Sequence, residues 1–413
     1  MNTLRREAYN RAYTEALMRD YQRRLEAWSG PTPFRLAETP LFVDDRLKEE
    51  LGRSAEEICA QLSVPSVLSQ LKKAIPASVN APGMDALPDC VQVDFALVRG
   101  EDGLLHGKLV ELQAFPSLYA LETLMADAWS QTLERVPGFE HAPLTCFLGV
   151  ERAEAVAWMK RVVVGEEDPF ETALVDYQPE QQKTVPDFHA TRLLFGVSPV
   201  CVTKLIREGR RLYRETGGQR VPVRRIYNRM VFDELDAKKV QMPFSFTDDL
   251  DVSWCSHPNW YWTWSKYALP FLDHPSVPKT RFLSDLGPDV PEDLENYVLK
   301  PLFSFAGSGV NIDLTPEAIA AIPIERRGGY LLQRKVQYAP VVPMPSHVDG
   351  FDPAAPGVKA ECRVMLLRHS ETGPRPLRSL IVLIRMSRGR MLGVDQNRGV
   401  AQTWSGGTVA LFG

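Results

Sequence analysis

The sequence lacks the two glycine-rich signatures that most often mark a nucleotide site. No Gly-x-x-x-x-Gly-Lys-Ser/Thr is present, and no Gly-x-Gly-x-x-Gly opens a helix in the 413 residues. Their absence excludes the P-loop and the dinucleotide-binding fingerprint as the basis of a phosphate site. No internal repeat or low-complexity segment is found either, which argues against a repeat architecture.

Long apolar runs and a basic charge surplus are also missing. No apolar stretch approaches the roughly 20 residues that a membrane helix needs, and residues 1–7 lack the apolar core of a secretory signal. The net charge is −4, whereas nucleic-acid-binding domains normally carry a basic surplus. The sequence therefore predicts neither a membrane nor a nucleic-acid partner.

Closely spaced cysteine pairs are absent, since none of the six cysteines forms a Cys-x-x-Cys. Most of them lie in apolar stretches, as reduced cytosolic thiols usually do. With 44% hydrophobic and 24% charged residues, the composition suits two or three globular domains. We therefore expect a cytoplasmic protein.

Residues 297–312 combine a short apolar run, a lysine and a loop of small residues. The run ends at Lys300, and the loop contains Ser304, Gly307, Ser308 and Gly309. Glycines let backbone N–H groups approach a phosphate closely, and the lysine adds a point charge. The pattern predicts a phosphate site at a strand end, and an ordinary glycine-containing hairpin is the alternative.

Residues 90–114 alternate apolar and polar side chains on both sides of a turn signal, Gly100-Glu-Asp-Gly103. Such alternation predicts two antiparallel strands. A hairpin centred on this turn puts Asp94 and Glu111 on neighbouring strands, with Gln113 on the face of Glu111. Two carboxylates and an amide oxygen suit Mg²⁺, with phosphate oxygens completing its shell. A polar face turned to solvent is the alternative.

The remaining N-terminal two thirds show helical and mixed patterns. Helices are predicted at 2–28 and at 44–73, the second broken near Pro65. Residues 140–240 predict an α/β unit, with strands at 144–150 and 173–177, a helix at 153–164 and a basic helix at 203–215. The arginines of 203–215 favour a solvated face over an anion site. The tryptophans of 254–264 have helical spacing and are predicted to be core, with base stacking as the alternative.

Strands dominate the last third of the chain. They are predicted at 330–336, 358–367 and 380–386. Gln333 lies near the centre of the first, Arg385 ends the last, and Lys359, Glu361 and Arg363 share one face of the middle one. Arginines on buried strands, beside a lysine and a glycine loop, fit the recognition of a polyphosphate.

These features occur in an order that resembles the synthetase domain of glutathionylspermidine synthase, a circularly permuted branch of the ATP-grasp superfamily, and its stand-alone relatives. The first match is Val-Asp-Phe at 93–95 with Leu-Val-Glu-Leu-Gln-Ala-Phe-Pro-Ser-Leu-Tyr-Ala-Leu-Glu at 109–122. It resembles the family's Arg-x-Asp-Phe followed by Leu-Glu-x-Asn-Ala-Asp-Thr-Pro-Thr. The second is Trp-Ser-Lys-Tyr-Ala-Leu-Pro with Asp-His-Pro at 264–275, which is similar to the family's Ser-Asn-Lys-x-Leu-x-Pro and Gly-His-Pro.

Two further matches lie in the C-terminal part. Tyr-Val-Leu-Lys-Pro-Leu-Phe-Ser-Phe-Ala-Gly-Ser-Gly-Val at 297–310 resembles the family's Tyr-Val-x-Lys-Pro-x-x-Ser-Arg-Glu-Gly-x-Asn-Val. Tyr-Leu-Leu-Gln at 330–333 and Ile-Arg at 384–385 resemble the family's nucleotide-strand Gln and its C-terminal Ile-Arg. The resemblance covers residues 90–400 loosely.

The resemblance implies a role for each matched position. The implied contacts with ATP are Lys266, Lys300, Ser304, Gly307, Ser308, Gly309 and Gln333, with the lysines on the phosphates and Gln333 in the adenine pocket. The implied Mg²⁺ ligands are Asp94, Glu111 and Gln113. Arg385 would neutralise the transferring phosphate or the acyl phosphate. ATP and Mg²⁺ are thus the cofactors that the resemblance implies.

The sequence departs from the family at the catalytic positions. Gln92 replaces an arginine that binds phosphate, and Gln113 replaces an asparagine. Phe305 and Ala306 replace an Arg-Glu pair in the loop. A neutral amide supplies no charge to phosphoryl oxygens, so a working enzyme needs another cation, for which Arg363 is the candidate. The substrates are therefore expected to differ from those of the family.

The sequence thus predicts a mixed α+β protein: a circularly permuted ATP-grasp fold with an accompanying α/β domain and an N-terminal helical segment. The predicted parts are the helical segment 1–80, the metal-site hairpin 81–137, the α/β substrate-side domain 138–245 and the nucleotide-binding part 246–413. The predicted function is an ATP- and Mg²⁺-dependent ligase that joins a small-molecule carboxylate to an amine through an acyl phosphate. A non-catalytic ATP-binding module acting through partner proteins and a small-molecule kinase are the alternatives. The sequence specifies neither the substrates nor the oligomeric state.

Overall fold

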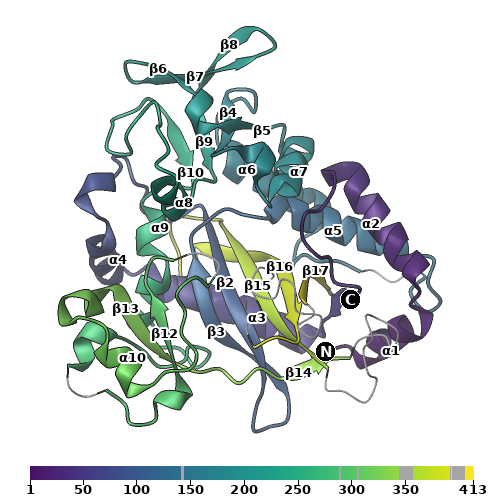
Figure 1. The fold of residues 1–413 in the computed structure, drawn as a ribbon. Helices are drawn as coiled ribbons and strands as arrows, with labels where there is room; N and C mark the ends of the chain where they lie inside the picture. Colours follow the sequence, from purple (N-terminus) through teal and green to yellow (C-terminus); the bar gives the residue numbers. More distant parts are fainter. Residues whose placement is uncertain (141–143, 288–289, 305–306, 344–356, 391, 393–404) are drawn as a thin grey trace.

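The structure is a computed structural model that describes residues 1–140, 144–287, 290–304, 307–343, 357–390, 392 and 405–413 (Figure 1). Its α-helices are α1 (Thr3–Ala12), α2 (Glu15–Ser29), α3 (Asp45–Leu62), α4 (Pro65–Leu71), α5 (Tyr119–Leu133), α6 (Arg152–Val164), α7 (Val185–Phe195), α8 (Phe232–Ala237), α9 (Trp260–Thr263) and α10 (Pro316–Ala320). Its strands are β1 (Leu41–Phe42), β2 (Cys90–Arg99), β3 (Leu105–Gln113), β4 (Thr172–Asp176), β5 (Ser198–Cys201), β6 (Ile206–Glu208), β7 (Arg211–Thr216), β8 (Gln219–Val223), β9 (Arg225–Asn228), β10 (Ser253–Cys255), β11 (Thr280–Phe282), β12 (Tyr297–Pro301), β13 (Tyr330–Arg334), β14 (Pro340–Val342), β15 (Val358–Arg368), β16 (Leu377–Ser387) and β17 (Ser405–Leu411).

The central sheet joins strands that are far apart in the sequence. Its order is β1-β17-β16-β15-β2-β3, and β14 also pairs with β15. The predicted hairpin is confirmed, because β2 and β3 are antiparallel and Asp94 lies opposite Glu111. Arg363 of β15 lies opposite Asp94 from the other side. Directly opposed residues of antiparallel strands share a face, so these side chains form one polar row.

Helices pack against this sheet at different places. Helix α3 lies behind it in Figure 1 and approaches so closely that a Cβ atom on Gly107 would come within 2.6 Å of Leu51 Cδ2. Helix α5 packs near β17, where Trp129 Nε1 donates to Thr408 Oγ1 at 3.2 Å. Its Trp129 ring stacks on Tyr21 of α2. The polar row therefore lies on the face that α3 does not cover.

A second sheet contains the strand predicted at 173–177, and the helix predicted at 153–164 forms α6. Its parallel strands run in the order β10-β9-β4-β5. Helices α6 and α7 lie beside it in Figure 1, as the alternation of strands and helices indicated.

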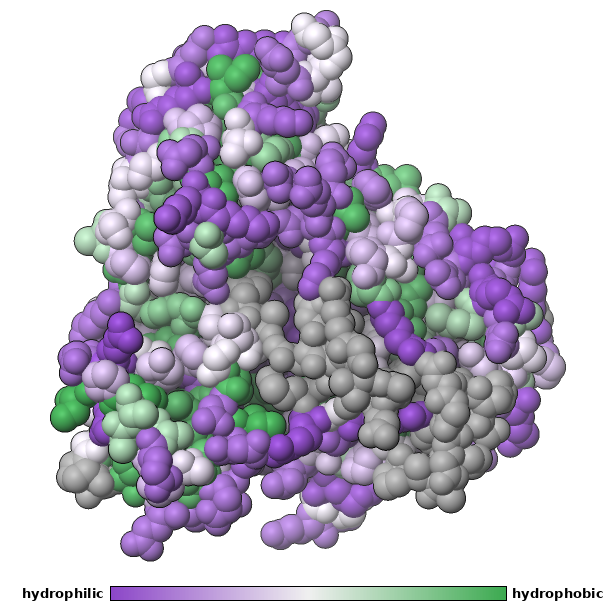
Figure 2. Space-filling model, viewed as in Figure 1, coloured by the Kyte–Doolittle hydropathy of each residue, from purple (hydrophilic) through white to green (hydrophobic). Residues whose placement is uncertain are grey.

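The predicted basic helix at 203–215 is wrong, because this segment forms β6 and β7. These strands and β8 make a three-stranded sheet at the top of Figure 1, and Figure 2 shows that this part of the surface is largely hydrophilic. Gly209, Gly217 and Gly218 all have positive φ, which tight turns need and a helix does not allow. Two arginines of this segment form ion pairs on the surface, because Arg207 and Arg210 pair with aspartates of 248–251.

A small three-stranded sheet, β11-β13-β12, carries the predicted phosphate lysine. Strands β12 and β13 are antiparallel, and Val298 lies opposite Gln333. Lys300 is two residues beyond Val298, so Lys300 and Gln333 lie on the same face. The opposite face, with Leu299 and Leu332, forms a separate apolar core.

The N-terminal region differs from its prediction in two respects. The helix predicted at 2–28 is split into α1 and α2, because Thr14 caps α2 by accepting a hydrogen bond from the Leu17 N–H at 3.1 Å. The segment 1–80 is not purely helical, since β1 pairs in parallel with β17. The strand predicted at 144–150 is likewise limited to isolated bridges at Thr145 and Phe147. Within the described residues, no helix combines the length and the apolar character required to cross a bilayer.

Candidate functional site

A cavity of about 740 Å³ lies between the polar row of the central sheet and the β12–β13 hairpin. Among the described residues, eight lysines and arginines and two glutamates line it. The cations are Lys266, Lys300, Arg334, Lys335, Lys359, Arg363, Arg385 and Arg390, and the acids are Glu111 and Glu361. We call this cavity the cationic cleft. Its excess of positive charge favours a polyanionic ligand.

Two arginines and two carboxylates form the floor of the cationic cleft. Arg363 donates to both oxygens of Asp94, from Nε at 2.6 Å and from Nη2 at 2.7 Å. Arg385 donates to Asp94 and to Glu361 from one nitrogen, Nη2. Burial alone would raise the pKa of Asp94, but Arg363 and Arg385 lower it below its usual value. The floor is therefore a buried ion-pair network with Asp94 at its centre.

Tyr338 completes this network from the segment after β13. Its hydroxyl donates to Glu361 Oε2 at 2.6 Å, and burial together with the charge of Glu361 raises its pKa. The strand pattern places Glu361 on the face of Arg363 but predicts no role for it, and Tyr338 was not predicted as a site residue. The alternation of lysine, glutamate and arginine on β15 is the sequence pattern that could have indicated a role for Glu361. Tyr338 has no local signal, because it reaches its partner across 23 residues.

Lys300 lies where the strand-end lysine was predicted, and its hydrogen-bond partners in the described part of the chain are neutral. Its Nζ donates to Gln333 Oε1 at 2.7 Å and to the carbonyl oxygen of Val110 at 2.7 Å. That carbonyl is free because the register of β2 and β3 shifts between Glu111 and Leu109 and leaves Val110 unpaired. Burial lowers the pKa of Lys300 to about 8, and the charge of Glu111 opposes this shift. Among the described residues the ammonium has no direct carboxylate partner, so it suits an anionic ligand.

Lys266, which follows α9, also lines the cationic cleft. Its Nζ donates to the Ser304 carbonyl oxygen at 2.6 Å and lies 3.1 Å from Glu111 Oε1. The side chain is almost fully buried. Lys266 thus ties β3 to the loop after β12, and it brings a second ammonium to the cleft that holds Lys300.

Buried donors in the cationic cleft remain unpaired. In the described part of the chain, Gln333 Nε2 and Arg385 Nε have no hydrogen-bond partner. A buried donor without an acceptor costs free energy, which a bound acceptor recovers. Gln333 Nε2 therefore fits an acceptor atom of a ligand such as adenine.

Gln92 has a structural role below the cleft. Its Nε2 donates to the Ser117 carbonyl oxygen at 2.6 Å, and its Oε1 accepts from Gln113 Nε2 at 2.8 Å. These bonds hold the segment that leads into α5. The next residue, Leu118, lines the cleft in a left-handed conformation with φ of 70°, which is strained for a leucine. Gln92 contributes no charge to a ligand.

The glycine loop is only partly at the cationic cleft. Gly307 lines it, whereas Ser308 and Gly309 do not. Gly309 has φ of 71°, and a Cβ there would lie 2.8 Å from Pro301 Cγ, so its glycine serves the turn itself. Ser304 faces a small adjoining hollow. Phe305 and Ala306 lie outside the described residues.

The predicted Mg²⁺ ligands are adjacent but do not fit a metal in this arrangement. Both oxygens of Asp94 accept from guanidinium groups, and Glu111 pairs with Lys266. Gln113 donates a hydrogen bond from its amide nitrogen to Gln92, so only its amide oxygen is available to a metal. No cluster of three His, Cys, Asp or Glu side chains that could hold a metal occurs in the described ranges. A hard cation needs several free oxygen donors together, and these residues do not provide them.

Comparison with known proteins relates this chain to others by structure alone. No family model matches the sequence, and no curated protein matches it. Among solved structures, a glutathione synthetase-like effector from Globodera pallida in its apo form matches with a TM-score of 0.60. The identity is 12%, and the match covers 96% of each chain. The chain therefore has a mixed α/β, glutathione synthetase-like fold.

Proposed function

We propose that the cationic cleft binds ATP through its phosphates. The observation that carries this proposal is the charge of the wall, where eight cationic side chains outnumber two glutamates in the described residues. Lys266 and Lys300 hold the phosphates as point charges, and the arginines add planar donors that match phosphate oxygens. Gln333 offers its unpaired amide nitrogen to the base.

The chain uses this ATP, in our proposal, to join a small-molecule carboxylate to an amine. The carboxylate attacks the γ-phosphate, ADP leaves, and the amine displaces phosphate from the acyl phosphate to give an amide. Arg363 and Arg385 neutralise the negative charge that develops during both steps. The glutathione synthetase-like fold and the resemblance to the circularly permuted glutathionylspermidine synthase family support this use.

A second candidate is a cytoplasmic nucleotide-binding module without turnover. Two observations favour it. Gln92 has a neutral amide where the resembled family has an arginine, and both oxygens of Asp94 pair with arginines. The test is incubation with ATP, Mg²⁺ and a panel of carboxylates and amines. ADP with an amide product supports the ligase, a phosphorylated alcohol supports a kinase, and binding without ADP supports the module.

Replacement of Lys300 by methionine is expected to weaken ATP binding by about 1.5–3 kcal/mol, the range for hydrogen bonds to charged groups. Methionine keeps the length and apolar stem of the side chain but removes the ammonium. Isothermal titration calorimetry measures the effect, with Lys160→Met on exposed α6 as the matched control. Equal affinities of wild type and Lys300→Met would contradict the assignment.

ATP affinity is expected to fall as the pH rises above about 8. The pKa of Lys300 is lowered to about 8 by burial, and a bound anion raises it, so ligand binding requires proton uptake above that pH. The phosphate groups themselves titrate near pH 6 and do not interfere. Calorimetry between pH 7 and pH 10 tests this. The loss of ATP affinity with rising pH should disappear in Lys300→Met. If the affinity of this variant still falls, another group is responsible and the assignment to Lys300 is contradicted.

A further inference from the structure

We infer that the cationic cleft binds the polyphosphate of its nucleotide without a divalent cation, and that Asp94 is a positioning residue for Arg363 and Arg385. The inference deepens the proposed ATP binding and rests on it. It follows from the disagreement between the predicted metal ligands and the contacts that these residues make.

The first observation is the complete use of the Asp94 carboxylate. The residue is 1% exposed, and it lies beneath Arg363 and Arg385, which line the cleft. Each oxygen accepts from a guanidinium nitrogen, and Oδ2 accepts from both arginines. A metal at Asp94 would displace both arginines and leave them buried without this counter-charge, which is costly.

The second observation is that the remaining donors do not replace Asp94. Glu111 lies 3.1 Å from Lys266 Nζ, and Glu361 is held by Tyr338 and Arg385. A divalent cation entering the cleft also meets the repulsion of the surrounding lysines and arginines.

The third observation is that protein cations line the cleft and that two of them are held by Asp94. Arg363 and Arg385 are oriented by Asp94 in the floor, and Lys300 of β12 and Lys266 of the segment after α9 also line the cleft. The orientation is fixed before a ligand arrives, so little side-chain entropy remains to be lost on binding. Guanidinium and ammonium groups thus take over the neutralisation that Mg²⁺ supplies in other nucleotide sites.

The test is calorimetric titration of ATP into the full chain, once in EDTA and once in excess Mg²⁺. We expect ATP to bind in EDTA at least as tightly as in Mg²⁺, because the metal removes negative charge from the ligand. Binding that requires Mg²⁺, or that is tenfold or more tighter with it, would overturn this inference and leave the proposed function standing. No binding in either buffer would contradict both.

A second titration uses Glu111→Gln, whose parent side chain is 25% exposed and therefore tolerates the change. The variant removes the carboxylate that pairs with Lys266. We therefore expect its affinity for ATP in EDTA to be equal to or higher than that of wild type. A metal ligand at position 111 would instead give a loss confined to the Mg²⁺ buffer, which would overturn the inference. Glu101→Gln, in the exposed β2–β3 turn, is the matched control.

Discussion

The free energy of unfolding of the Asp94→Asn variant is expected to be about 3–5 kcal/mol lower than that of wild type, because removing one partner of a buried ion pair leaves the other charge unpaired. The amide is nearly isosteric, but among the described residues it leaves Arg385 with Glu361 as its carboxylate partner and Arg363 with none. It also places an amide N–H₂ against guanidinium donors. Urea unfolding followed by circular dichroism measures the loss.

Asp313→Asn is the matched control for this variant. Asp313 also binds an arginine through both oxygens, with Arg390 Nη1 at 2.9 Å and Nη2 at 2.6 Å, but both side chains are exposed. Exposed pairs contribute little, so its unfolding midpoint should match that of wild type. An Asp94→Asn protein as stable as the control would show that Asp94 is not the centre of a buried network.

The pH dependence of stability gives an independent check. The folded-state pKa of Asp94 is lowered, so its carboxylate stabilises the protein above the pKa of the unfolded state, about 3.9. This contribution disappears as the pH falls through the lower folded-state value. The stability difference between wild type and Asp94→Asn should therefore be constant near neutrality and shrink below about pH 4.

Arg363→Ala is expected to reduce turnover by about 10²–10³-fold, and at least as severely as Arg385→Ala, if the chain is a ligase. Arg363 lines the cationic cleft and lies in the strand next to Arg385, whereas Gln92 supplies no charge. We therefore expect Arg363 to take the role of the arginine that the resembled family has at the position of Gln92. ADP release per folded molecule, with Mg²⁺ and a panel of carboxylates and amines, measures the effect.

Two further variants separate this compensation from a general loss of charge. Arg390→Ala removes an exposed cation from the same cleft and should leave turnover near the wild-type value. Gln92→Arg should still bind ATP. An active wild type with an unimpaired Arg363→Ala would refute the compensation. A wild type that binds ATP without turnover, and gains activity from Gln92→Arg, would favour the nucleotide-binding module.

Local patterns predicted the elements that carry the site. The alternation in residues 90–114 predicted β2, β3 and the pairing of Asp94 with Glu111, because the period of a strand assigns each side chain to a face. The position of Lys300 near the end of β12 was predicted from the short apolar run that precedes it. The helix predicted at residues 203–215 was wrong, because the spacing of its basic residues fits a helix while Gly209 and Gly217 make strand turns.

The partners of these residues could not be predicted locally. Asp94 meets Arg363 across 269 residues and Arg385 across 291 residues. The sequence pattern of a strand with alternating acids is the same whether the acidic face binds a metal or pairs with arginines of another strand. Only the order β16-β15-β2-β3 decides between them, and that order depends on long-range pairing. The polar face was thus predictable, whereas its use by arginine was not.

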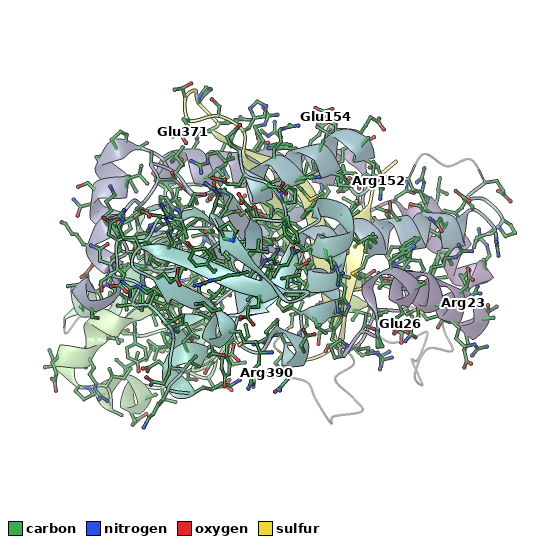
Figure 3. The ribbon with its side chains drawn as sticks, turned by 90° about the horizontal axis from the view of Figure 1, so that it is seen from above. Arg23, Glu26, Arg152, Glu154, Glu371 and Arg390 are labelled. Atoms are coloured by element: carbon green, nitrogen blue, oxygen red, sulfur yellow. The ribbon has the colours of Figure 1, made fainter. Side chains whose placement is uncertain are left out.

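The crystal structure of the chain with a non-hydrolysable ATP analogue tests the central claim most directly. A second cavity of about 500 Å³, lined by Glu154, Trp158 and Arg368, offers a contrasting location. Figure 3 shows Glu154 on the opposite side of the molecule from Arg390 of the cationic cleft. Our account predicts the phosphates within hydrogen-bond distance of the Lys266 and Lys300 ammonium groups and the base beside Gln333. An analogue bound in the second cavity, with the cationic cleft empty, would contradict it.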